Sequence, residues 1–364
     1  MSKRELYVLL YVASILASIG IGIGMRSIPM GLLLIFVLRF VVNFWYAQIN
    51  GVGTGPKVLA SIFSGCGFIY LMGLDKNIPG ALAILDDTVK IYEKNFKDLV
   101  LYPLLQFASI IALVLLGVVI WILASFLPQV AQYIVIILFS VVIFVAIVIS
   151  SLLFMIGLYL AIKRVTDGLP KLNVKETLKL SWEKLASFLG SSILGYLYAI
   201  WPLIIAIILL AVYATTTMAY SLGGINTNAL LQGSRAFVVV LTLAIVYGIF
   251  HFIYFSIRLV FNYLSVLFAD QKAGESLNYS KTLTKGHWWA VAWRIYAPAW
   301  IIAFIVIILS FIIEIFSFFG PVGVGITNIF SLVLQIMITP IVAIIMVLVY
   351  QHLERQKTTI PPSI

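Results

Sequence analysis

Charged residues are scarce in this chain. They make up 10% of its 364 residues, whereas hydrophobic residues make up 63%. A soluble domain carries about 25% charged residues, which its surface requires. The scarcity therefore excludes a soluble fold of this size and leaves the bilayer as the solvent that fits. Because a chain in lipid must satisfy its backbone hydrogen bonds internally, only helices or a closed barrel remain.

Cysteine and histidine are also nearly absent. Cys66 is the only cysteine, which excludes an internal disulfide and a cysteine-cluster metal site. The three histidines are too scattered to build a metal site by themselves. The sequence has no Walker A loop, dinucleotide fingerprint, HExxH or GxSxG motif, and its connectors are too short to fold a catalytic domain. We expect no enzyme activity and no cofactor from this chain alone.

Long apolar runs are what the sequence has instead, with a mean hydropathy of +1.15. The runs do not alternate between polar and apolar residues, so they predict helices rather than barrel strands. The fold class expected is an all-α polytopic membrane protein with about eight transmembrane helices. The expected spans are 6–24, 30–47, 99–126, 133–162, 188–213, 237–268, 289–318 and 322–350.

One further apolar stretch, 57–74, is short and contains glycine. It fits a ninth span, a re-entrant hairpin or an interfacial segment. The first run has the charge and length of a signal peptide but lacks a clear cleavage site, so we interpret it as the first span.

Basic residues predict the orientation of the chain. The connectors 80–98, 163–187 and 269–288 and the tail after Tyr350 contain fourteen Lys and Arg residues, whereas the alternating connectors contain one, Arg235. Basic residues in short loops favour the cytoplasmic side, so the C-terminus is expected there in a cell membrane. Lys3 and Arg4 place the N-terminus on the same side. An even number of spans must then precede Asp98, which favours a stretch 57–74 that does not cross.

Three connectors contain amphipathic segments. Apolar residues recur at helical spacing in 82–99 and in 174–189, where Asn173 is a suitable N-cap, and a weaker pattern occupies 275–286, which Gly286 is expected to end. Each segment precedes two long spans, and Pro103, Pro202 and Pro298 lie in the first span of each group. This predicts three repeats of an interfacial helix plus a transmembrane hairpin: 80–170, 171–272 and 273–364 with a cytoplasmic tail, after an N-terminal region 1–79.

An interfacial helix with lysines on its polar face favours the headgroups of an anionic leaflet. The candidate headgroup contacts are Lys90, Lys94, Lys97, Lys175, Lys179, Lys184, Lys281 and Lys285. The alternative is a purely structural role, in which these helices only join one hairpin to the next. Membrane lipids are the expected partners, with other membrane proteins or a second copy as further candidates. Nucleic acid is not expected, because the orientation of the chain already explains its excess of basic residues.

Ionisable residues within apolar runs are candidate functional residues, because burying them in lipid is costly. His251, Tyr254, Arg258 and Asn262 are expected to form one polar strip along a helix. In the structural interpretation, the residues of this strip form hydrogen bonds between helices. In the functional interpretation, they line a binding site. Arg39 and Glu314 are two further intramembrane charges near span ends.

The layout resembles the membrane domain fused to bacterial glycerophosphodiester phosphodiesterases and related stand-alone inner-membrane proteins. Two features carry the resemblance. A short amphipathic segment, "LKLSWEKLASFLG" or "SKTLTKGHWWAVAW", leads into a long span, and the last span ends with "MVLVYQHLERQ". The likeness covers residues 82–355. In the fused proteins the hydrolase is a separate soluble barrel, so the resemblance implies membrane location and lipid-associated work without catalytic residues.

The sequence therefore favours a non-enzymatic multi-pass protein that engages lipid or membrane-protein partners through cytoplasmic interfacial helices. A small-molecule or ion transporter or channel is the first alternative. The second is a membrane anchor that recruits a soluble partner through the basic connector 163–184.

Overall fold

The computed structural model describes residues 3–24, 28–52, 57, 61, 79–222 and 227–359. Within these ranges every regular element is a helix. The chain divides into two compact units, Met1–Ala83 with Gly286–Trp300, and Ile84–Lys285 with Ile301–Ile364. Cys66 and the predicted segment 57–74, apart from Lys57 and Ser61, lie outside the described residues.

Five stretches of the described chain are long and apolar enough to cross a membrane. They are Ala81–Ala124, Gln129–Thr166, Val174–Thr216, Phe237–Phe268 and Trp288–Lys357, and the last of them contains two long helices in succession. Their length and composition indicate a helical membrane protein. The full count of eight spans stays a prediction.

The first unit contains the helices α1 (Lys3–Gly24) and α2 (Ile28–Ile49). The hydroxyl of Tyr7 donates a hydrogen bond to Oδ1 of Asn43 over 2.7 Å, and the rings of Tyr7 and Tyr46 stack with centroids 3.9 Å apart. Tyr7 is completely buried. Trp289, from the later segment of the same unit, packs against this aromatic cluster.

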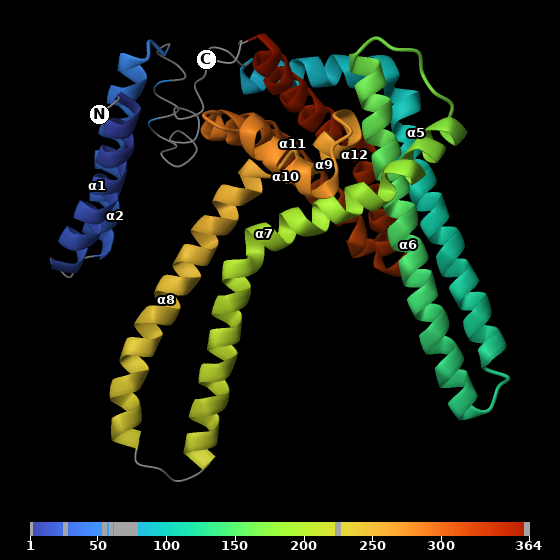
Figure 1. Cartoon of the computed structure of the whole chain (residues 1–364), viewed down its shortest axis with the longest axis horizontal. Coiled ribbons are helices and arrows are strands. Elements are labelled where there is room, and N and C mark those ends of the chain that lie inside the picture. Colours follow the sequence, from blue (N-terminus) through green and yellow to red (C-terminus); the bar gives the residue numbers. More distant parts are fainter. Residues whose placement is uncertain are drawn as a thin grey trace. The chain divides into compact units, whose positions relative to one another are not determined.

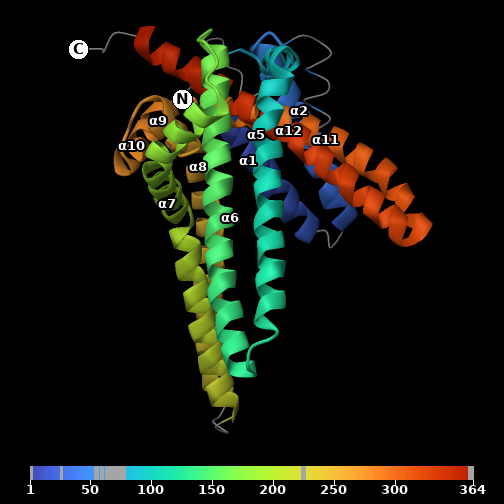
Figure 2. The same ribbon diagram turned by 90° about the vertical axis from the view of Figure 1, so that its right-hand side faces the viewer.

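The second unit contains two long helical hairpins. One pairs α5 (Ala81–Ala124) with α6 (Gln129–Thr166), and the other pairs α7 (Val174–Leu222) with α8 (Thr227–Arg258). Figures 1 and 2 show α5 and α6 running side by side to a short turn. Ser109 and Ser150 share a hydrogen bond of 2.6 Å across the first hairpin. Leu203 occupies the space beside Gly248 in the second.

The first two predicted interfacial segments are continuous with the spans that follow them. Figure 1 shows that α5 and α7 each change direction within their own length. In α5 the helix kinks at Asn95, whose φ and ψ are −123° and 20° and whose side chain donates to the carbonyl oxygen of Ile91 over 3.0 Å. Pro103 and Pro202 lie inside α5 and α7, where each removes one backbone hydrogen bond.

The expected span 237–268 is long and apolar enough to cross a membrane, but it is not one continuous helix. The helix α8 ends at Arg258, three turn residues follow, and α9 covers Asn262–Phe268. The break is stabilised from α10 (Ala273–Leu283), because the hydroxyls of Ser280 and Thr284 both donate to the carbonyl oxygen of Arg258, over 2.9 Å and 3.3 Å. Gly286 has a φ of +83° in the turn that follows α10, as expected for a residue that ends a helix.

The chain ends with α11 (Trp288–Glu314), the short 3-10 helix η1 (Ile315–Phe319) and α12 (Gly320–Thr359). Gly320 turns the chain between η1 and α12 with a φ of +72°, a conformation that favours glycine. The side-chain amide of Gln351 in α12 donates to Thr166 over 2.8 Å and to Asp167 over 2.9 Å. These bonds hold the last helix against the end of α6.

Candidate functional site

The start of α7 has three distinct faces. Asn173 caps it, because the backbone amide of Glu176 donates to Oδ1 of Asn173 over 2.8 Å and the Glu176 carboxylate accepts from the Asn173 amide over 3.3 Å. With about 100° between successive residues, three rows run along the helix. The buried row faces the protein and consists of Thr177, Ser181, Phe188 and Ser191. The apolar row consists of Leu178, Trp182, Leu185 and Leu189. The charged row consists of Lys175, Lys179 and Glu183.

The protein-facing row of this segment differs from the apolar pattern in the sequence. Thr177, Ser181 and Ser191 are at most 1% exposed, whereas Trp182, in the apolar row, is 60% exposed. Small polar residues let membrane helices approach each other closely and form hydrogen bonds. In the apolar row, Trp182 and Leu189 are exposed on the outside of the fold, whereas Leu178 and Leu185 are half-buried.

The start of α5 repeats this order. Its buried row consists of Ile84, Thr88, Asn95 and Leu99. Its outer apolar row includes Val89 and Phe96, whose exposed fractions are 41% and 39%. Its charged row includes Lys90, Lys94 and Lys97. In α7, and in α5 as far as the kink at Asn95, the apolar row follows the buried row by about 100° around the helix, and the charged row follows the apolar row by a similar angle. The two segments thus have the same three faces in the same order.

The third segment differs. The helix α10 is only 11 residues long, is separate from α11, and buries Ser276, Leu277, Ser280 and Leu283. It leaves no large apolar residue in an outer row. Two of the three predicted copies therefore share the three-faced pattern, and the threefold repeat stays a prediction.

The eight candidate lysines separate into two groups. Lys184 donates to the carbonyl oxygen of Leu267 over 3.1 Å and pairs with Asp270, and the Lys281 ammonium lies 3.8 Å from the ring centroid of Tyr198. Both contacts lie within the fold. The other six side chains are exposed: Lys90, which pairs with Asp86, and Lys94, Lys97, Lys175, Lys179 and Lys285, for which the described residues provide no carboxylate partner.

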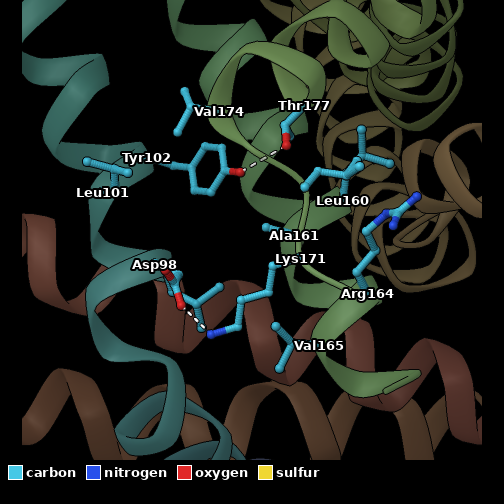
Figure 3. A pocket seen from close by; sticks show the side chains of 12 residues that line it. Asp98, Leu101, Tyr102, Leu160, Ala161, Arg164, Val165, Lys171, Val174 and Thr177 are labelled. Carbon is cyan, nitrogen blue, oxygen red and sulfur yellow. Dashed lines mark hydrogen bonds and ion pairs between the residues drawn. The ribbon is translucent and has the colours of Figure 1, made fainter. Parts of the chain in front are cut away.

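A small pocket lies where α5, the end of α6 and the start of α7 meet. Figure 3 shows the hydroxyl of Tyr102 directed at Thr177, and Lys171 paired with Asp98. The Tyr102 hydroxyl donates to the Thr177 oxygen over 3.2 Å. Arg164 also lines the pocket and donates to the carbonyl oxygen of Pro170 over 2.9 Å. The polar groups of this pocket already have partners, so its evident role is to hold the kinked α5 against the connector and α7.

The predicted polar strip does not follow one helix. His251 and Arg258 lie on α8, but Asn262 begins α9 beyond the break, which corrects the expectation of one continuous face. Nδ1 of His251 lies 3.2 Å from the carbonyl oxygen of Ala199, and Arg258 lies over the ring of Tyr254 at 5.8 Å. Asn262 bonds separately to α7. The contacts of His251 and Asn262 link their helices to α7, whereas the contact between Arg258 and Tyr254 lies within α8. Whether the strip lines a binding site stays a prediction.

The two other intramembrane charges lie at different places. Arg39 lies over the ring of Tyr11, 5.2 Å from its centroid, within the first unit. Glu314 is exposed at the last residue of α11. Tyr279 of α10 and Tyr350 of α12 both donate to Oε1 of Glu354 in α12, over 3.3 Å and 3.2 Å. Burial raises the pKa of Tyr279, and the Glu354 carboxylate raises it further.

The described residues contain no group of three or more His, Cys, Asp or Glu side chains able to hold a metal ion. No family model, curated protein or solved structure matches the chain. The resemblance to the membrane domain fused to glycerophosphodiester phosphodiesterases therefore stays a prediction.

Proposed function

We propose that this chain is a non-enzymatic multi-pass protein of the cytoplasmic membrane that engages anionic lipid through the starts of α5 and α7. The observation that carries the proposal is the shared order of faces in these two segments. Each has an outer apolar row, including Trp182 in one and Phe96 in the other, between a buried row and a row of exposed lysines.

That order suits a helix lying in the plane of the headgroups. The outer apolar row can enter the boundary of the hydrocarbon while the charged row stays among the headgroups. Each Lys near an anionic leaflet contributes about 1 kcal/mol, reduced by neighbouring acidic residues and by salt. Lys94, Lys97, Lys175 and Lys179 are the side chains proposed to contact lipid, with both termini on the same cytoplasmic side.

Transport is the weaker candidate. A transported polar substrate requires a polar path through the spans, and the predicted strip from His251 to Asn262 is divided between two helices and bonded to neighbouring backbone.

The test compares lipid selectivity. The purified protein is reconstituted in nanodiscs with equal amounts of phosphatidylglycerol and phosphatidylcholine of identical chains, and the lipids that stay bound are counted by native mass spectrometry. We expect phosphatidylglycerol to be enriched several-fold on the wild type. A variant with Lys94, Lys97, Lys175 and Lys179 all changed to Gln should retain the two lipids about equally.

Two controls make the result specific. The same four positions changed to Arg keep the charge, so the enrichment should persist. Lys184→Gln removes a lysine with partners inside the fold and should leave the enrichment unchanged. An enrichment that survives the fourfold Gln change would refute the proposal.

A further inference from the structure

A groove of about 400 Å³ opens between α5, α6 and α12. Its walls are mainly apolar, including Phe107 and Ile110 of α5, Met155 of α6 and Ile336 of α12. The volume lies within the range of about 300–1,000 Å³ that is typical of ligand sites. Because the groove lies among helices long and apolar enough to cross a membrane, we expect hydrocarbon rather than water to adjoin it.

Two amide side chains interrupt this apolar lining. Gln106 of α5 and Gln335 of α12 both line the groove. Their backbone carbonyl oxygens accept hydrogen bonds from Ser109 and Thr339. Within the described part of the chain, their side-chain amides have no hydrogen-bond partner. An amide left without a partner in hydrocarbon costs several kcal/mol, so a ligand with oxygen atoms at this position would be stabilised.

The depth of Gln106 indicates which oxygens these are. Gln106 follows Asp98 by eight residues on the same helix, which corresponds to about 12 Å along its axis. Asp98 pairs with Lys171 at the charged end of the hairpin. The headgroup layer is roughly 5 to 7 Å thick on each side of the hydrocarbon. With Asp98 at the outer edge of that layer, Gln106 lies about 5 to 7 Å below it, and its side chain can extend toward the ester oxygens at a lipid's glycerol.

We propose that this groove binds one glycerolipid of the membrane, with a hydrocarbon chain between the apolar walls and glycerol oxygens accepting hydrogen bonds from Gln106 and Gln335. Neither amide is charged, so the site recognises the hydrocarbon chain and the glycerol oxygens of a lipid. It does not distinguish a charged headgroup from a neutral one. The groove therefore predicts retention of a lipid that is independent of the proposed selectivity of the interfacial lysines.

Native mass spectrometry after stepwise removal of lipid with detergent tests the site. The probes are phosphatidylcholine and phosphatidylglycerol of identical chains, offered separately. We expect about one lipid per chain to resist removal from the wild type with either probe. Met155→Trp and Ile336→Trp each fill the groove and should abolish that retained lipid.

A second pair of variants keeps the groove open. Gln106→Leu and Gln335→Leu remove the donors at nearly constant volume, and each should weaken retention about five-fold. Leu138→Trp provides the matched control, because Leu138 of α6 is 60% exposed and does not line the groove. Thermal unfolding of every variant identifies any that has lost its fold.

The outcomes separate the two proposals. Loss of the retained lipid in the groove variants but not in Leu138→Trp supports the site, whatever the interfacial lysine variants do. Equal retention in the wild type and in both Trp groove variants overturns it, as does an equal loss in the Leu138→Trp control. A preference for phosphatidylglycerol that disappears only in the lysine variants concerns the proposed function alone.

Discussion

The side-chain amide of Asn262, at the start of α9, donates a hydrogen bond of 2.8 Å to the backbone carbonyl oxygen of Ser191 in α7. Gly195, one turn further along α7, makes this approach possible, because a Cβ atom there would overlap the same amide nitrogen. The oxygen of the Asn262 side chain accepts from the amide of Tyr263 over 2.7 Å. One side-chain amide therefore bonds the backbone at the start of α9 and also fixes this helix to α7.

Gly195→Ala should destabilise the protein by about 2 kcal/mol, because the added methyl group must displace Asn262 from a packed contact. Gly274→Ala is the matched control. No atom lies within 4 Å of the position that its Cβ would take, so this change in α10 should be neutral or stabilise by up to about 1 kcal/mol. Thermal unfolding in one detergent measures both. Equal midpoints for the two variants would show that α9 and α7 are not in tight contact.

Lys184 and Lys179 should differ in their effect on stability, although both belong to the same predicted set. Lys184→Gln removes a hydrogen bond to the carbonyl oxygen of Leu267 and should cost about 1 kcal/mol. Its ion pair adds little to this figure, because Asp270 is 85% exposed. Lys179→Gln affects only an exposed side chain and should stay within about 0.5 kcal/mol of the wild type. A larger loss for Lys179→Gln would contradict this assignment.

The contact between Lys281 and Tyr198 is suited to a double-mutant cycle. A cation lying over an aromatic ring in a partly desolvated place contributes about 1 kcal/mol. Lys281→Met and Tyr198→Leu, singly and together, should give a coupling energy of that size in chemical denaturation. Lys281→Arg should retain most of the coupling. Additive single effects would indicate that Lys281 is free to contact headgroups, as the sequence predicted.

The long apolar helices were accessible from the sequence because length and composition alone specify them. The break after Arg258 was not. The three turn residues, Leu259, Val260 and Phe261, are apolar and carry no turn signal. The two hydroxyls that bond the freed carbonyl oxygen come from Ser280 and Thr284, more than twenty positions later. A pattern confined to one segment cannot include a partner that only the tertiary fold supplies.

The amphipathic segments show a second limit. Their hydrophobic periodicity predicted one apolar row in each segment but gave no indication of which row faces the protein. The predicted row of 82–99 combined Leu99, which is completely buried, with Val89 and Phe96, which are exposed. In α7 the buried row is made largely of hydroxyl-bearing residues such as Thr177 and Ser181, which a hydropathy scale counts as polar. Close packing of helices in lipid favours small residues, so this signal is one of size. The groove at Gln106 and Gln335 was missed for a related reason, since its walls come from three helices distant in sequence.

The orientation of the second unit leads to the last prediction. In a Cys66→Ser background, single cysteines replace Lys94, Lys179 and Lys285 at the basic end of the helices, and Gln129 and Phe318 at the opposite turns. All five positions are exposed in the structure, so burial in the fold does not limit their reaction with a maleimide.

A membrane-impermeant maleimide applied to intact cells should label only positions 129 and 318. The other three should react only after the membrane is opened, because the excess of fourteen basic residues against one predicts that their connectors lie in the cytoplasm. Labelling of 94, 179 or 285 in intact cells would reverse the orientation and remove the anionic inner leaflet from the reach of these lysines.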